Sequence, residues 1–201
     1  MAKLYFKYGA MGSSKTAQAL ITKYNYEEND MRTWLIKPSA DTRDGTNILR
    51  SRIGLEAEVD VMTPDTDIFT LFTQTKKDAC HVVIVDECQF MTPEQIDQLR
   101  LIVDEWDVPV LCFGLRTDFQ TKLFPGSRRL MEIADVFQEI KTMCDCGNKA
   151  TVNARIDSTG HIVTQGEQVV LGGNDAYIAM CHRCYIRGIR ERRTIKLHGQ
   201  K

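Results

Sequence analysis

The chain has 201 residues, of which 43% are hydrophobic, and its formal net charge is −1. This length suits one large domain or one domain with a small appendage, and the hydrophobic content favours a packed core over disorder. The balanced charge gives no overall basic signal for nucleic acid or an anionic membrane, and no apolar run approaches the roughly 18 residues of a membrane span. The N-terminus enters a predicted strand without the apolar segment of a signal peptide.

A Gly-rich segment stands between a predicted strand at residues 4–8 and a predicted helix that includes residues 17–21. The segment comprises Gly9, Ala10, Met11, Gly12, Ser13, Ser14, Lys15 and Thr16. A strand, Gly-rich turn, Lys-Thr pair and helix are the layout of a phosphate-binding loop, whose backbone N–H groups face an anion. We therefore expect Lys15 to reach the β- and γ-phosphates of a nucleotide and the Thr16 hydroxyl to bind Mg²⁺. The alternative is a plain strand–turn–helix with Lys15 in a solvated first turn.

One position departs from this pattern, because Ser14 stands where the motif has Gly before the Lys. A Ser adopts the turn only at a conformational cost, and its side chain crowds the phosphates. Gly12 supplies part of the lost freedom. Since Lys15 and Thr16 are both retained, we expect activity to survive, with weaker ATP binding or a shifted loop geometry.

The next elements follow from apolar patterns. Residues 33–36 predict a second strand, and the polar residues 39–54 predict a mobile loop. Apolar and acidic side chains alternate over residues 55–61, which predicts a short half-exposed strand. Residues 67–76 predict a helix with one apolar face.

A β-branched run at residues 81–85 lacks alternation, which is typical of a strand buried on both faces. Two carboxylates, Asp86 and Glu87, follow it directly. This is the layout of a Walker B strand, in which the terminal Asp approaches Mg²⁺. A strand that simply ends in two solvated acids is the alternative, but the Gly-rich Lys-Thr loop about 70 residues upstream disfavours it.

The remaining core elements indicate the fold class. The Thr-Pro pair at residues 92–93 predicts a helix start, and residues 108–114 predict another buried strand. Strands that alternate with helices indicate an α/β domain with a mostly parallel sheet. Ligands of such sheets bind at the carboxyl ends of the strands, where Gly9, Asp86 and Leu115 fall.

Four of the seven cysteines form two close pairs, Cys144 with Cys146 and Cys181 with Cys184. Two thiolate pairs fit tetrahedral Zn²⁺ and indicate metal chemistry in a reducing compartment, so we expect a structural zinc in a cytoplasmic protein. His182 is an alternative ligand, although its place inside the second pair suits a helix surface better. The other three cysteines lie in or beside apolar runs, which indicates small buried hydrophobes: Cys80, Cys88 and Cys112.

These motifs resemble the thymidine kinase family of the type that combines a phosphate-loop core with a small zinc domain. The resemblance covers nearly the whole chain and rests on five stretches: residues 9–16, 37–43, 86–90, 114–119 and 172–177. No single stretch is decisive, but chance is a poor explanation for all five in this order. The first cysteine pair is C-x-C, where C-x-x-C also occurs in the family.

The resemblance implies a RecA-like α/β core with a mostly parallel sheet, followed by a small zinc-binding domain. The core is expected at residues 1–140, and the zinc domain, with a lasso loop over the nucleoside, at residues 141–201. The implied reaction transfers the γ-phosphate of ATP, with Mg²⁺, to the 5′-hydroxyl of deoxythymidine, and yields dTMP for DNA synthesis by pyrimidine salvage. The resemblance also implies a homotetramer that dTTP inhibits. We expect neither a nucleic-acid nor a membrane partner.

Residue roles follow from the same resemblance. Glu87 is the implied general base for the nucleoside 5′-hydroxyl, a role that suits phosphoryl transfer. The implied Mg²⁺ residues are Thr16, Asp86 and Asp41. The implied ATP contacts are Gly9, Ala10, Met11, Gly12, Ser13, Ser14, Lys15, Thr16, Arg43, Asp86 and Gln89.

The implied nucleoside contacts are apolar, aromatic or in a Gly-rich stretch: Met11, Phe90, Leu115, Phe119, Phe124, Val170, Leu171, Gly172 and Tyr177. Apolar and aromatic side chains suit a flat pyrimidine. Val170 and Gly172 would offer backbone hydrogen bonds to the base edge. Ordinary core packing is the alternative for each side chain, and it suits Phe119 and Tyr177 least, because both lie in polar, Gly-rich surroundings.

Two other classes of protein stay open. A P-loop ATPase would also use Asp86 and Glu87, since a Glu after the Walker B Asp can activate water. Such an ATPase has no use for the aromatic residues and the lasso glycines. A zinc-ribbon nucleic-acid module is suggested by the arginines at residues 183–193, but the net charge of −1 and the lack of interleaved aromatic residues disfavour it.

Overall fold

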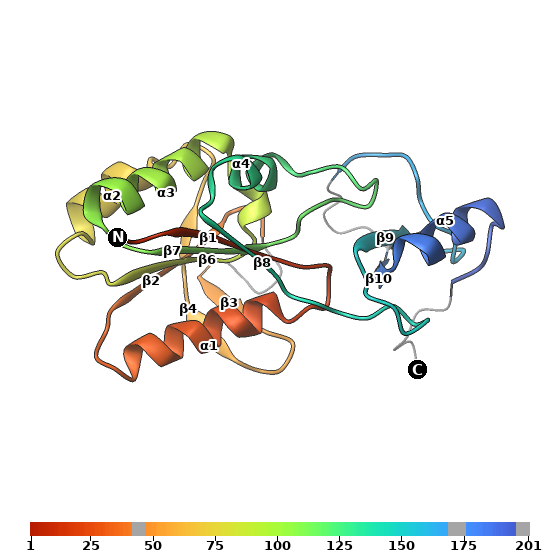
Figure 1. Ribbon diagram of the computed structural model, residues 1–201, viewed down its shortest axis with the longest axis horizontal. Coiled ribbons are helices and arrows are strands. Elements are labelled where there is room, and N and C mark those ends of the chain that lie inside the picture. The colour runs from red at the N-terminus through yellow and green to blue at the C-terminus, as the bar shows by residue number, and fades with distance from the viewer. Residues whose placement is uncertain (42–46, 169–175, 196–201) are drawn as a thin grey trace. The chain divides into compact units, whose positions relative to one another are not determined.

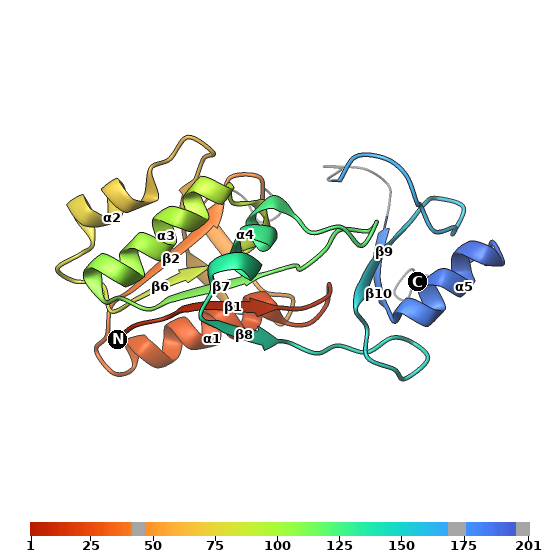
Figure 2. The same ribbon diagram turned by 45° about the horizontal axis from the view of Figure 1, so that its top comes forward.

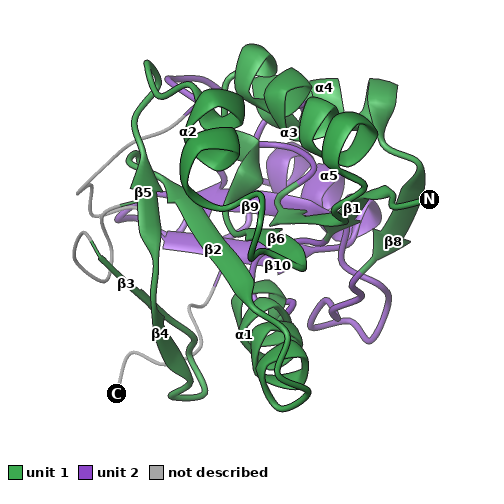
Figure 3. Ribbon diagram, turned by 90° about the vertical axis from the view of Figure 1, so that its left-hand side faces the viewer, with its two compact units in different colours: residues 1–8, 14–115, 124–139 green, residues 9–13, 116–123, 140–201 purple. Residues whose placement is uncertain are grey.

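The computed structural model describes residues 1–41, 47–168 and 176–195 (Figure 1). The described residues form two compact units, which Figure 3 distinguishes by colour. Unit 1 contains Met1–Tyr8, the described residues of Ser14–Leu115, and Phe124–Glu139. Unit 2 contains Gly9–Ser13, Arg116–Leu123 and the described residues from Ile140 onward. The functional division at residues 140 and 141 stays a prediction.

Unit 1 is built on a six-stranded sheet in which every pairing is parallel. Its strands, in spatial order, are β5 (Asp60–Met62), β2 (Thr33–Pro38), β6 (Val82–Val85), β7 (Val110–Gly114), β1 (Leu4–Tyr8) and β8 (Val136–Glu139). The central strands β6 and β7 are buried along their whole length, as their unbroken apolar runs predict. The predicted α/β class with a mostly parallel sheet is therefore confirmed.

Helices cover both faces of this sheet. They are α1 (Lys15–Glu27), α2 (Ile68–Thr75), α3 (Pro93–Trp106) and α4 (Pro125–Ile133), with a 3₁₀ turn η1 at Cys88–Phe90. The helix α1 lies on one face, and α2, α3 and α4 lie on the other (Figures 1 and 2). The start of α3 is a capping box, in which the Thr92 side chain and the Gln95 side chain each accept a backbone N–H.

The structure differs from the expected loop at residues 39–54. Within it, β3 (Ile48–Arg50) pairs antiparallel with β4 (Glu56–Glu58). This hairpin is anchored by one apolar side chain, since Leu49 is 2% exposed while its neighbours face solvent. A three-residue strand with a single buried side chain is too short to give a period-2 signal. The predicted strand over residues 55–61 is likewise divided between β4 and β5.

Unit 2 contains a two-stranded antiparallel sheet of β9 (Val152–Ile156) and β10 (Ala176–Met180), followed by α5 (His182–Arg190). All five residues of β9 are buried. Apolar side chains of β9 pack with Met180, Tyr185 and two of the paired cysteines in a separate small core. Across the described ranges, none of the helices has the length and apolar character that crossing a bilayer requires.

Candidate active site

The turn after β1 requires glycine at its first position. A Cβ on Gly9 would lie 2.4 Å from Ser13 Oγ and 2.5 Å from the Ile140 carbonyl oxygen. The turn closes through the Ser13 N–H, which donates to the Ala10 carbonyl at 3.3 Å. Gly12 has a φ of +71°, in the left-handed region that glycine enters without strain. The backbone of residues 9–13 is therefore curled tightly ahead of α1, as a phosphate-binding loop requires.

Ser14 occupies the position at which the sequence motif has glycine. Its backbone conformation explains the preference for glycine there. It is the N-cap of α1 with a φ of 62° and a ψ of 27°, and its side chain makes no capping hydrogen bond. A left-handed conformation costs a residue with a Cβ roughly 1 kcal/mol. The conformational cost expected from the sequence is therefore present in the structure.

Replacing Ser14 with Gly should stabilise the protein, because the strain disappears while no capping bond is lost. We expect a gain of about 1 kcal/mol, which raises the Tm by about 2–4 °C for a chain of this size. Thermal unfolding checks this, with Ser158→Gly as control, because Ser158 is exposed and does not have a positive φ. A Tm for Ser14→Gly no higher than that of the control would contradict the strain.

The side chains after the turn meet the end of β6. Thr16, in the first turn of α1, donates from Oγ1 to Asp86 Oδ2 at 2.7 Å. Asp86 is 1% exposed, and its Oδ1 has no hydrogen-bond partner among the described residues. Burial, and then the charge of Glu87, raise the Asp86 pKa well above its usual range, against the opposing effects of Thr16 and Lys15. A buried carboxylate oxygen without a donor, beside a hydroxyl, is a donor set that fits Mg²⁺.

Glu87 and Gln89 are held together in the turn that follows. Glu87 is buried and has a φ of 50°. Gln89 Nε2 donates to Glu87 Oε2, and Gln89 Oε1 accepts the Leu115 N–H at 2.9 Å. Since a backbone N–H can donate only to the amide oxygen, Leu115 fixes which way the Gln89 amide faces. Gly114 leaves room for this contact, because a Cβ there would lie 2.6 Å from Gln89 Oε1.

The contact between Gln89 and Glu87 was not predicted from the sequence. Gln89 is wholly buried, and both polar atoms of its amide are engaged within unit 1. Two polar residues two positions apart in a turn are too common to indicate a contact. The ATP contact of Gln89 stays a prediction.

Asp41, expected on the Mg²⁺ side, lies beyond β2 and is 5% exposed. Its Oδ2 is 3.7 Å from Lys37 Nζ, and that ammonium also donates to the Ile48 carbonyl at 3.1 Å. Asp41 thus forms a buried ion pair with Lys37. Its role toward Mg²⁺ stays a prediction, and Arg43 lies outside the described residues.

Two of the candidate nucleoside residues in unit 1 contact each other. Phe90 and Phe124 form an edge-to-face pair with ring centroids 5.6 Å apart and an interplanar angle of 78°. Leu115, the third candidate of this unit, is half-buried at the end of β7.

Unit 2 holds the other described candidates. Phe119 is 1% exposed, and the Arg155 guanidinium lies 5.1 Å from its ring centroid. Met11 and Tyr177 are half-buried. The expected lasso contacts, Val170, Leu171 and Gly172, lie outside the described residues.

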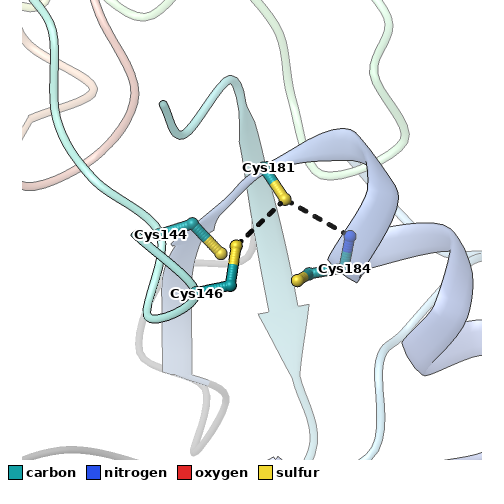
Figure 4. A group of neighbouring side chains, drawn as sticks. All are labelled: Cys144, Cys146, Cys181 and Cys184. Atoms are coloured by element: carbon teal, nitrogen blue, oxygen red, sulfur yellow. Dashed lines mark hydrogen bonds between the residues drawn. The ribbon is translucent and has the colours of Figure 1, made fainter. Parts of the chain in front are cut away.

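The four paired cysteines converge in unit 2 (Figure 4). Their sulfur atoms all lie within 4.8 Å of one another, and Cys146 Sγ is 3.6 Å from Cys181 Sγ. Four thiolates at this spacing fit one tetrahedral Zn²⁺, so the C-x-C spacing of the first pair does not keep either sulfur away. His182 is exposed and is not part of the cluster.

Hydrogen bonds shift the pKa values of two of these thiols in opposite directions. The backbone and side chain of Asn148 lower the pKa of Cys146 to about 6, which favours the thiolate that a metal binds. Hydrogen bonds to Cys146 and Cys181 raise the pKa of Cys184 to about 12. Crowded sulfurs resist carrying several negative charges, and a divalent cation offsets that repulsion.

Comparison with known proteins places this chain in a family. A family model described as "Thymidine kinase" matches residues 2–185. The chain is 46% identical to a thymidine kinase of Ruegeria pomeroyi over 91% of this chain and 93% of that protein. The chain belongs to the thymidine kinase family. Thymidine kinases of Yersinia pseudotuberculosis (44% identical, 94% of this chain and 97% of theirs) and Legionella pneumophila (46%, 95% and 92%) are similar along nearly their whole lengths.

Membership of the thymidine kinase family confirms the resemblance drawn from the sequence. The match at residues 2–185 includes the Gly-rich turn and Lys15, the two carboxylates after β6 and all four clustered cysteines. All of these features thus lie within the stretch that the family model matches.

Proposed function

We propose that this protein transfers the γ-phosphate of ATP to the 5′-hydroxyl of deoxythymidine, which yields dTMP and ADP. The observation that carries the proposal is the hydrogen bond from Thr16 to the buried, under-satisfied Asp86, with Glu87 directly beside it. A hydroxyl and carboxylate for the metal, followed by a second carboxylate for a hydroxyl proton, are what phosphoryl transfer to an alcohol needs. Family membership supports thymidine as that alcohol.

In the proposed reaction, Glu87 takes the proton of the 5′-hydroxyl as that oxygen attacks the γ-phosphorus. The new bond joins the 5′-oxygen to phosphorus, and the bond between phosphorus and the bridging oxygen of ADP breaks. Gln89 supports this role, because its amide donates to Glu87 and holds the carboxylate in one orientation.

The phosphate chain of ATP would lie on the backbone N–H groups of residues 9–16, with Lys15 near the β- and γ-phosphates. Thr16 and Asp86 would hold Mg²⁺, and Asp41 and Arg43 would act on the same side. Bound Mg²⁺ neutralises negative charge on the phosphates.

For the nucleoside, we assign base and sugar contacts to Met11, Phe90, Leu115, Phe119, Phe124 and Tyr177. Their apolar or aromatic character supports this assignment. The lasso residues Val170, Leu171 and Gly172 would read the base edge through the main chain.

The wider setting is also proposed from the family resemblance. The product dTMP would enter DNA synthesis by pyrimidine salvage in the cytoplasm, the protein would act as a homotetramer, and dTTP would inhibit it. Sedimentation of the purified protein tests the tetramer, and inhibition by added dTTP at fixed thymidine tests the regulation.

The deciding experiment measures ADP release by the purified protein with ATP and Mg²⁺, with and without nucleosides. We expect strong release with thymidine and little with cytidine or purine nucleosides. Release that no nucleoside changes would favour a P-loop ATPase instead. No release under any condition would refute phosphoryl transfer by this loop.

A further inference from the structure

A buried amide on β9 connects two distant segments of unit 2. Asn153 is 2% exposed and stands in a strand of which every residue is buried. Its Oδ1 accepts the Met11 N–H at 2.7 Å, and its Nδ2 donates to the Thr117 carbonyl at 2.8 Å. Met11 belongs to the segment Gly9–Ser13 and Thr117 to the segment Arg116–Leu123, both of which group with unit 2.

The chemistry of the two partners fixes the orientation of this amide. A backbone N–H can meet only the amide oxygen, and a backbone carbonyl can meet only the amide nitrogen. Asn153 therefore satisfies one donor and one acceptor that belong to different turns of the chain. A buried backbone group that loses its partner is costly, so both turns depend on this side chain.

Each partner lies in a segment that the proposed function places in contact with a substrate. Met11 is in the turn that would receive the ATP phosphates. Thr117 is two residues before Phe119, whose backbone carbonyl accepts the Tyr185 hydroxyl at 2.9 Å and whose ring lies under Arg155. The Thr117 segment is thus anchored to α5, the helix that contains Cys184 of the cysteine cluster, as well as to β9.

We propose that Asn153 is a positioning residue for the kinase reaction, which fixes the phosphate turn at Met11 to the nucleoside segment at Thr117. It acts by holding the Met11 amide in one place. This inference rests on the proposed function for its effect on catalysis. The hydrogen bonds themselves also make a prediction that does not depend on activity.

Two substitutions separate the two bonds. Asn153→Leu removes both and keeps the same branched skeleton of side-chain heavy atoms, and we expect the KM for ATP to rise about tenfold because the phosphate turn is released. Asn153→Asp keeps an acceptor for the Met11 N–H but turns a carboxylate oxygen toward the Thr117 carbonyl. We expect the Asn153→Asp variant to retain slow hydrogen exchange at Met11, whereas Asn153→Leu accelerates this exchange about tenfold or more.

The matched control is Val152→Ala, the neighbouring buried residue of β9. Val152 packs in the small core of unit 2 and its side chain has no hydrogen-bonding group, so the substitution should lower the Tm while leaving the KM for ATP and Met11 exchange unchanged. If Asn153→Leu matches this control in both KM and exchange, the inference is overturned. If the Leu variant does not fold, Asn153→Asp decides: exchange at Met11 as slow as in the wild type supports the Met11 bond, and fast exchange contradicts it.

The wild-type assay keeps the two proposals apart. Wild-type protein that turns over ATP without using thymidine would refute the proposed function, while Met11 exchange would still test the Asn153 bonds. Wild-type protein that phosphorylates thymidine, together with an Asn153→Leu variant of unchanged KM and exchange, would refute the Asn153 role alone.

Discussion

Replacing Glu87 with Gln is expected to lower kcat for thymidine phosphorylation by about 10²–10⁴-fold, the usual contribution of a general base. Binding of ATP and thymidine should change little. A Gln at this position can present its carbonyl oxygen to Gln89 Nε2, so the hydrogen bond in the turn after β6 survives. The substitution removes a negative charge beside buried Asp86. It leaves Thr16 and Asp86 unchanged, so the metal side of the site loses no ligand.

Steady-state kinetics and equilibrium binding of both substrates check this result. The control is Glu94→Gln, which makes the same chemical change at an exposed position in the first turn of α3. We expect the control to have wild-type kcat. Wild-type turnover in Glu87→Gln would remove Glu87 from the mechanism, and a parallel loss of substrate binding would indicate a structural role instead.

Replacing Cys181 with Ser is expected to abolish zinc binding and to unfold unit 2. The free energy of structural zinc binding is on the order of 10 kcal/mol, comparable to the whole stability of a domain. Cys181 is the N-cap of α5 and its Sγ accepts the Cys184 N–H. Ser is itself a good N-cap, so the substitution preserves the capping of α5. The effect of the variant therefore reports the loss of a zinc ligand and not the loss of a helix cap.

Metal analysis and thermal unfolding measure this effect. We expect about one zinc per chain in the wild type and almost none in the variant, since a tetrahedral site needs its four ligands. Cys80→Ser is the control, because Cys80 is a half-buried thiol of unit 1 outside the cluster. A Cys181→Ser protein with full zinc and an unchanged Tm would show that this sulfur is not a ligand.

Local patterns in the sequence were enough to predict much of the fold and part of the candidate site. The unbroken apolar run of β6, the Thr-Pro start of α3 and the Gly-rich turn before Lys15 each act within a few residues of the chain. The cysteine spacings likewise predicted a cluster that the structure brings together. Such features are readable because their physical cause is local.

The features that sequence reasoning missed depend on contacts between distant residues. The Gln89 bond to Leu115 and the Asn153 bonds to Met11 and Thr117 involve single buried amides, which leave no periodic signal. The helix α4 was missed for another reason. It buries only Gly126, Ser127 and Leu130, so its sequence lacks a broad apolar face.

The grouping of Gly9–Ser13 with the described residues from Ile140 onward has a consequence for protein engineering. A chimaera that joins residues 1–139 of this protein to the C-terminal part of a relative would keep the turn at Gly9 but replace the residues packed against it. Those residues include Asn153, whose side-chain Oδ1 accepts the Met11 N–H of the turn. In shuffled proteins, residues 9–13 and 140–156 should therefore come from the same parent, although most of unit 1 separates these two segments in the sequence.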